Sequence, residues 1–222
     1  MTNSPAAFID QNASGPRIGL FGGTFDPIHL GHLRLALELK QQFSLDEMHL
    51  LPCYLPPHRA APGATANQRV AMLRLALQDC PQLQLDTREL QRDRPSYTVD
   101  TLTELRAQLG EQVSLSLCMG MDSFCTLDSW HEWSQLIQLA HIVVVERPGY
   151  ELPVVGPVAE LLRRHRAGAD AIQAAAAGAT AMLLIAVTGS TPAARFHADL
   201  GGTDTLALLV GEVLAAQLPG EQ

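Results

Sequence analysis

The sequence has no feature of a membrane or secreted protein. None of the apolar runs in its 222 residues approaches the length needed to cross a bilayer. Residues 1–16 are small and polar, without the cationic start and apolar stretch of a secretory signal, and we interpret them as a flexible leader. The four cysteines form neither a CxxC pair nor the spacing of a zinc site, which favours reduced thiols. We therefore expect a cytoplasmic protein without a membrane partner.

Positive charge and aromatic residues are also scarce. Lys and Arg number 15 against 23 Asp and Glu, giving a formal net charge of −8, and aromatic residues make up 5% of the chain. An acidic surface repels phosphate backbones, so we expect no nucleic-acid partner, and any phosphate site must be local. The hydrophobic content of 47% is ordinary for a globular protein, and one domain is the expectation for this length.

Short apolar runs alternate with longer segments of helical period. This order is typical of a parallel sheet that is covered by helices on both faces. The expected strands are residues 17–21, 47–52, 82–86, 114–119, 141–145 and 181–187. The expected helices are residues 29–43, 67–79 and 96–110, the last with Ser96 and Thr98 as candidate caps and Gly110 as its stop. The predicted fold class is α/β, a Rossmann-like doubly wound parallel sheet.

Residues 167–181 are the single low-complexity segment of the sequence. Their alanines favour a helix, but Gly168 and Gly178 interrupt it. A surface helix and a mobile connection are both open for this segment.

The segment FGGTFDPIHLGH, residues 21–32, follows the first expected strand and runs into the first expected helix. In open α/β sheets, ligands lie beyond the carboxyl ends of the strands, where a helix N-terminus offers N–H groups to a phosphate. Gly22 and Gly23 let the backbone approach an anion without a Cβ in the way. His29 and His32 are three residues apart, so on a helix they would share one face and reach the same phosphate chain. We predict a phosphate site whose histidines stabilise charge at the reacting phosphorus.

Other phosphate loops and other histidines are set aside. The chain has neither the GK[ST] of a Walker loop nor the third glycine of the dinucleotide fingerprint. A lone histidine is more often a hydrogen-bonded core or surface residue than a functional one. We expect such structural roles for His49, His141, His165 and His197.

Residues 21–32 resemble the HxGH motif of the nucleotidyltransferase superfamily, and further motifs narrow the resemblance. In chain order these are LPCYLPPHR, ELQRDRPSYTVDTL, GMDSF, LDSWHEW and AHIVVVERPGY, between residues 51 and 150. Their order and spacing are similar to those of the bacterial nicotinate-nucleotide adenylyltransferase family. The resemblance implies a single nucleotidyltransferase domain over residues 17–222, with residues 188–222 as its C-terminal helical part.

The resemblance also implies which residues hold ATP. At the phosphates it places Gly22, Gly23, Thr24 and Phe25, the catalytic His29 and His32, and the mobile cation Arg59. The family's C-terminal motif, of the form S-[SA]-T-x-I-R, corresponds here to the altered TGSTPAAR, which adds Ser190, Thr191 and Arg195. Arg195 comes one place late for that motif, and Pro192 disturbs the expected helix start.

The remaining motifs imply the mononucleotide site. Carried over by position, its residues are Thr98, Gly120, Asp122, Trp130, His131 and Arg147. A flat pyridine ring can stack on the indole of Trp130, while N–H groups and a nearby cation receive the nicotinate carboxylate. On the residues alone, filling of the core by Trp130 is an equally good interpretation.

The resemblance implies transfer of the adenylyl group of ATP to nicotinate mononucleotide, in NAD biosynthesis. The 5′-phosphate would attack the α-phosphorus in line, and Mg²⁺ would enter with ATP rather than at a metal site of the protein. Two alternatives stay open: an adenylyltransferase for another phosphate acceptor, and a catalytically weak nucleotide-binding protein of the same fold. A homo-oligomer is also compatible with the sequence.

Overall fold

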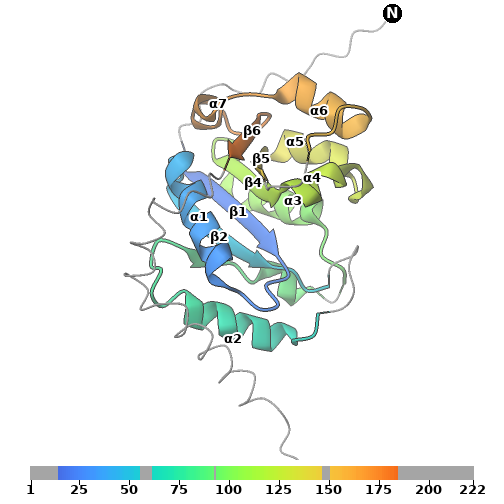
Figure 1. Cartoon of the computed structure of the whole chain (residues 1–222). Coiled ribbons are helices and arrows are strands. Elements are labelled where there is room, and N and C mark those ends of the chain that lie inside the picture. The colour runs from blue at the N-terminus through green and yellow to red at the C-terminus, as the bar shows by residue number, and fades with distance from the viewer. Residues whose placement is uncertain (1–14, 56–61, 93, 147–150, 185–222) are drawn as a thin grey trace, which may run out of the picture.

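Six parallel strands form one sheet in the computed structural model, which describes residues 15–55, 62–92, 94–146 and 151–184 (Figure 1). The strands are β1 (Arg17–Gly23), β2 (Glu47–Pro52), β3 (Gln84–Leu85), β4 (Ser114–Gly120), β5 (His141–Glu146) and β6 (Thr180–Leu184), in the order β3-β2-β1-β4-β5-β6. A strand is present at each of the six predicted places, and residues 185–187 of the sixth prediction lie outside the described residues. The third is shorter than predicted, because only its two central residues pair with β2.

Seven α-helices connect the described strands. They are α1 (Leu30–Gln42), α2 (Ala66–Ala76), α3 (Thr98–Leu109), α4 (Met121–Cys125), α5 (Leu136–Leu139), α6 (Pro157–His165) and α7 (Ala169–Ala174). Three short 3₁₀ turns accompany them: η1 (Arg88–Gln91), η2 (Leu127–Ser129) and η3 (Trp133–Gln135). No helix in the described part of the chain is both long and apolar enough to span a bilayer.

Local sequence signals explain where two of the helices begin and end. Thr65 and Gln68 form a capping box at the start of α2, so each satisfies a backbone N–H of the other. Gly110 ends α3 with a positive φ of 85°, as predicted. The predicted caps of α3 were wrong, because the N-cap residue is Tyr97 and makes no side-chain cap bond. The Ser96 hydroxyl instead accepts a hydrogen bond from the N–H of Tyr54 at 2.9 Å.

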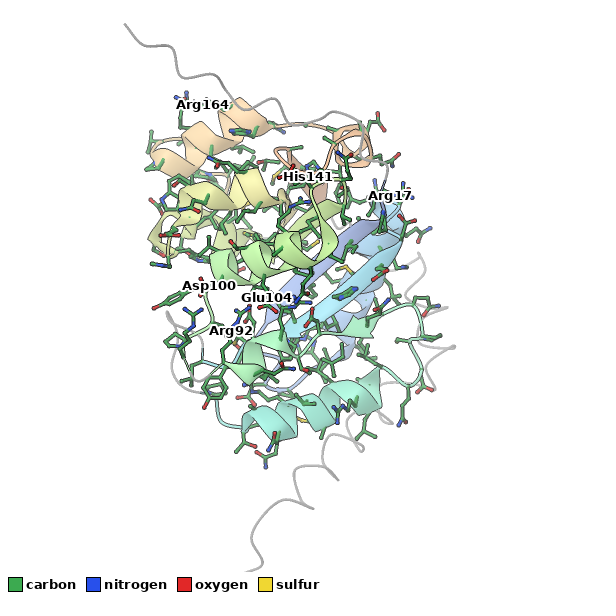
Figure 2. All side chains as sticks on the ribbon, turned by 180° about the vertical axis from the view of Figure 1, so that it is seen from behind. Arg17, Arg92, Asp100, Glu104, His141 and Arg164 are labelled. Atoms are coloured by element: carbon green, nitrogen blue, oxygen red, sulfur yellow. The ribbon has the colours of Figure 1, made fainter. Side chains whose placement is uncertain are left out.

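Helices cover both faces of the sheet. Buried side chains of α1, α2 and α7 form one apolar cluster with the sheet, and those of α3, α4, α5 and α6 form a second. The strands serve both clusters because alternate side chains point to opposite faces: Leu117 and Met119 of β4 belong to the second, and Cys118 to the first. In Figure 1, α1 lies in front of the sheet, and the view from behind in Figure 2 brings α3 to the front. The doubly wound α/β fold is confirmed.

The strand order reverses between β1 and β4. These neighbours pair in parallel, with Phe21 opposite Cys118, yet the chain runs from β1 outward through β2 and β3 before it returns to β4. The loops that leave β1 and β4 therefore cross to opposite faces. Between them lies the crevice in which open α/β sheets bind ligands.

The amino ends of the strands are held by buried polar groups. The Arg106 guanidinium donates to the carbonyl oxygens of Leu139 at 2.7 Å, Val113 at 2.6 Å and Ala176 at 2.8 Å. His141 is fully buried, and its Nε2 bonds the Ala175 carbonyl at 2.8 Å.

The same contacts define the alanine-rich segment. Its residues form α7 and the turn into β6, with Ile172 fully buried in the first cluster. The His141 Nδ1 accepts the N–H of Ala179 at 3.1 Å, and His165 bonds the Gly178 carbonyl at 2.9 Å. The first part of the segment is thus a short surface helix with one buried side chain, and its second part is a hydrogen-bonded turn rather than a loose connection. Both histidines have the structural roles expected of them.

His141 should make folding stability depend on pH. Burial lowers the pKa of its imidazole, and the nearby Arg106 charge acts in the same direction. Its stabilising contribution is complete above the unfolded pKa of about 6.5 and is lost as pH falls toward the folded value. His141→Leu should reduce the free energy of unfolding by roughly 1–3 kcal/mol at pH 8, because two backbone groups lose their partners.

Urea unfolding at pH 5 to 8 tests this dependence. The loss of stability below pH 6.5 should be smaller in His141→Leu than in the wild type. His49 provides a control of opposite sign: burial lowers its pKa, but Asp86 and Glu47 outweigh burial and raise it. The contribution of His49 is therefore present at low pH and lost as pH rises. Equal slopes in wild type and His141→Leu would contradict the prediction.

Candidate active site

The loop after β1 brings two imidazole rings together. His29 has extended backbone angles (φ −146°, ψ 168°) and is the N-cap of α1, whereas His32 lies in the first turn of the helix. Their ring centroids are 3.7 Å apart, and the ring planes differ by 28°. His29 therefore lies before the helix rather than on it. The two side chains nevertheless lie together on one side, as predicted, and their rings stack. Both lie at the carboxyl end of β1, at the edge of the crevice.

Phe25 supports this pair from inside the fold. Its side chain is 2% exposed, and its ring meets His32 edge-on at a centroid distance of 5.2 Å. The backbone of Phe25 has a positive φ of 50°, an uncommon conformation for a residue with a side chain. Since the ring is buried, only the backbone of Phe25 can meet a ligand.

Glycines leave room for neighbouring rings at two positions of this loop. A Cβ on Gly23 would lie 3.0 Å from the Phe25 ring, and a Cβ on Gly31 would lie 3.0 Å from Nδ1 of His29. At Gly22, by contrast, a Cβ would have no described atom within 4 Å. Two glycines thus allow the rings to pack, while Gly22 leaves open space in front of the backbone.

Contacts from β2 and α2 fix the course of the loop. The Asp26 carboxylate accepts hydrogen bonds from the N–H groups of Gly63 at 2.6 Å and Ala64 at 3.2 Å. The Cys53 N–H donates to the Gly23 carbonyl at 3.0 Å. These contacts were not predicted, because the partners of Asp26 are 37 and 38 residues away along the chain.

Cys53 lies beside the loop and is a thiol rather than a thiolate. Its Sγ is 3.8 Å from the Thr24 hydroxyl, and burial raises the pKa of the thiol. Cys80, Cys118 and Cys125 are also free cysteines. The described cysteines therefore form no disulfide, as their spacing indicated.

The far side of the crevice carries most of the expected mononucleotide residues. Gly120 ends β4, Asp122 lies in the first turn of α4, and Thr98 begins α3. The ring of His131 lies 4.6 Å from that of Tyr97, next to Thr98. Trp130 is half-buried and packs against the second apolar cluster, so its indole has both a packed part and an accessible part.

A buried carboxylate lies beneath the start of α3. Glu89 is 5% exposed and accepts a hydrogen bond from the Thr101 hydroxyl at 2.8 Å. Burial raises the pKa of this carboxyl, while bonds from the Thr101 and Ser96 hydroxyls oppose the shift. Arg92 donates to Thr101 at 2.8 Å and also pairs with Glu104, near which it appears in Figure 2. The motif ELQRDRPSYTVDTL contains Glu89, Arg92 and Thr101, but only its Thr98 was assigned a role, so this network was not predicted.

Several predicted site residues cannot be placed. Arg59, Arg147, Ser190, Thr191 and Arg195 lie outside the described residues, as do the first fourteen residues, His197 and residues 188–222. Within the described ranges, no group of three or more His, Cys, Asp or Glu side chains lies together as a metal site would require.

Comparison with known proteins identifies the class and then the family. Residues 20–193 match the cytidylyltransferase-like family model, which defines the chain as a nucleotidyltransferase of that class. A Cellvibrio japonicus protein is 59% identical over 168 residues, covering 76% of this chain and 80% of its own. A Chromohalobacter salexigens protein is 40% identical over 203 residues, covering 91% and 93%. Both are named "Probable nicotinate-nucleotide adenylyltransferase", and the chain belongs to the nicotinate-nucleotide adenylyltransferase family.

A solved structure supports the fold independently. The Plasmodium falciparum nicotinic acid mononucleotide adenylyltransferase complexed with NaAD matches with a TM-score of 0.59 and 15% identity. The match covers 78% of this chain and 77% of the other. At this identity the likeness concerns the fold alone.

Gly31→Ala should stabilise the protein and displace His29. Alanine in place of glycine favours helix by up to about 1 kcal/mol, which corresponds to roughly 2–4 °C in melting temperature for a chain of this size. The added Cβ would lie 3.0 Å from Nδ1 of His29, so the His29 ring should shift by a few tenths of an ångström relative to His32. Thermal unfolding and the NMR signals of the His29 ring measure the two effects.

Gly22→Ala is the matched control for this change. Its Cβ meets no described atom within 4 Å, so the His29 signals should stay where they are in the wild type. Unchanged His29 signals in Gly31→Ala would contradict the prediction, because the methyl group would then be accommodated without a shift of the His29 ring.

Proposed function

We propose that this protein transfers the adenylyl group of ATP to nicotinate mononucleotide, forming nicotinate adenine dinucleotide and pyrophosphate in NAD biosynthesis. The observation that carries the proposal is the stacked His29–His32 pair beside the open backbone of Gly22 at the strand-order reversal. The names of the two relatives give the acceptor. The free cysteines fit an enzyme of the cytoplasm.

The reaction needs positioning and charge stabilisation more than a base. A phosphate oxygen of the mononucleotide attacks the α-phosphorus of ATP, and the bond from that phosphorus to the bridging oxygen breaks, so that pyrophosphate leaves. His29 and His32 donate hydrogen bonds to phosphate oxygens and stabilise the charge that develops on them. Thr24, Gly22, Gly23 and the backbone of Phe25 line the same phosphates, with Arg59, Ser190, Thr191 and Arg195 as further ATP contacts.

The divalent ion enters with the substrate. Among the described residues, no group of three or more His, Cys, Asp or Glu side chains lies together. We assign Mg²⁺ to the triphosphate of ATP, whose charge it neutralises. No step on the protein side depends on where that ion lies.

The mononucleotide binds across the crevice. Gly120, the last residue of β4, and Asp122, in the first turn of α4, contact the mononucleotide in this proposal, as do Thr98 and His131 near the start of α3. The accessible part of Trp130 offers a face to the pyridine ring, and Arg147 closes the site. Residues 17–222 form one domain in this proposal.

Pyrophosphate release with ATP, Mg²⁺ and either nicotinate or nicotinamide mononucleotide tests the function. We expect strong preference for the nicotinate form. His32→Ala should lower turnover by roughly 10²–10³-fold with an unchanged circular dichroism spectrum, because the lost group acts on transition-state charge. Preference for another acceptor would show that nicotinate mononucleotide is not the substrate. No pyrophosphate release with either mononucleotide, together with tight ATP binding, would indicate a nucleotide-binding protein instead.

Trp130→Ala should separate ring stacking from core packing. Loss of a stacking face costs about 1–3 kcal/mol, so the Michaelis constant for the mononucleotide should rise about 10-fold or more, and that for ATP much less. Trp133→Ala is the matched control, since Trp133 is also half-buried and packs against the same cluster. It should lower the melting temperature without changing either constant. An equal rise of both constants in Trp130→Ala would assign Trp130 to the core.

A further inference from the structure

Arg69 is a buried cation that no motif explains. It lies in the second turn of α2 and is 1% exposed, in a stretch whose neighbours Met72 and Leu73 are core residues. Its guanidinium donates from Nη1 to the Thr24 carbonyl at 2.7 Å and from Nη2 to the Tyr54 carbonyl at 3.2 Å. Nε has no hydrogen-bond partner among the described atoms.

Neither of these contacts brings an opposite charge to Arg69. Both acceptors are neutral carbonyl groups, and no carboxylate of the described residues forms an ion pair with the guanidinium. Burying a cation costs several kcal/mol unless an opposite charge offsets it. A methionine or leucine would fill the same volume of apolar core at no such cost, so packing alone does not account for an arginine here.

The first contact acts on the phosphate loop. Thr24 supplies the carbonyl, and the N–H of the same peptide group belongs to Phe25, whose left-handed backbone turns the loop toward His29. In a trans peptide the two groups point in opposite directions. A cation on the carbonyl side therefore strengthens the N–H as a donor and holds the peptide in one orientation.

The second contact reaches the other half of the crevice. Tyr54 accepts from Arg69 through its carbonyl and donates its N–H to the Ser96 hydroxyl at 2.9 Å. The Ser96 N–H returns a bond to the Leu55 carbonyl at 3.3 Å. Ser96 lies two residues before Thr98, where α3 begins. One guanidinium thus ties the loop expected at ATP to the segment expected at the mononucleotide.

We propose that Arg69 is a positioning residue for adenylyl transfer, which sets the phosphate loop and the start of α3 at a fixed separation and adds positive potential beneath the triphosphate. This inference rests on the proposed function. Misplacement of reacting groups by about 1 Å can cost 10²-fold in rate. The effect should therefore appear in turnover of the folded enzyme and not only in stability.

The test compares two substitutions at Arg69 with one at Arg106. Arg69→Met keeps the volume and removes the charge, and Arg69→Lys keeps the charge but loses the fork that reaches two carbonyls. Arg106→Met is the matched control, because Arg106 also donates only to backbone carbonyls, but at the amino ends of the strands. Turnover and both Michaelis constants are measured well below the melting temperature of each variant.

We expect turnover to fall by about 10- to 100-fold in Arg69→Met and by a smaller factor in Arg69→Lys. Arg106→Met should lose melting temperature and keep turnover within about twofold of the wild type, because it is remote from the crevice. If Arg69→Met does not fold, a turnover loss in the folded Arg69→Lys variant carries the same meaning.

Two results would overturn the inference, and they differ. Wild-type turnover in folded Arg69 variants, with a lower melting temperature alone, would make Arg69 a structural residue and leave the proposed function intact. A wild-type protein that releases no pyrophosphate would overturn the proposed function, and the positioning role with it.

Discussion

The parallel pairing of β1 with β4 is the constraint on which the site depends. These strands are distant in sequence, yet Phe21 lies opposite Cys118, so the ends of both strands reach the same edge of the sheet. Their following helices, α1 and α4, pack on opposite faces. A crevice between the two loops follows from this topology before any side chain is considered. The sheet topology therefore determines where the glycines, histidines and hydroxyls of the site lie.

Within that crevice, the loop geometry is maintained by buried rings together with hydrogen bonds from neighbouring segments. The buried Phe25 ring meets His32 edge-on, and Gly23 and Gly31 leave room for the rings of Phe25 and His29. Asp26 fastens the outer side of the loop to the start of α2. The imidazoles are thus held in place before a ligand arrives, which is what charge stabilisation of a transition state requires.

Much of this could be predicted from the sequence, because it is local. The six strands, the stop at Gly110 and the proximity of His29 and His32 each follow from a short stretch of chain. The contacts that were missed are long-range: Asp26 with Gly63, and Arg69 with Thr24 across 45 positions. An arginine among core residues of an amphipathic helix was the one available signal. Arg69 is three and four positions before the buried Met72 and Leu73, but this spacing does not indicate which carbonyl groups the guanidinium contacts.

Arg69 and Arg106 show that the same kind of contact can have two different roles. The buried Arg69 and the half-buried Arg106 each donate to carbonyl groups of separate segments, and each lies at one end of the strands, where backbone acceptors lack a neighbouring strand. At the amino ends, the hydrogen bonds of Arg106 join α3, α5 and the alanine-rich turn. At the carboxyl ends, the same chemistry leaves a positive charge beside the phosphate loop. An anionic substrate can offset that charge there, so the energetic cost of burial at Arg69 becomes a gain on binding.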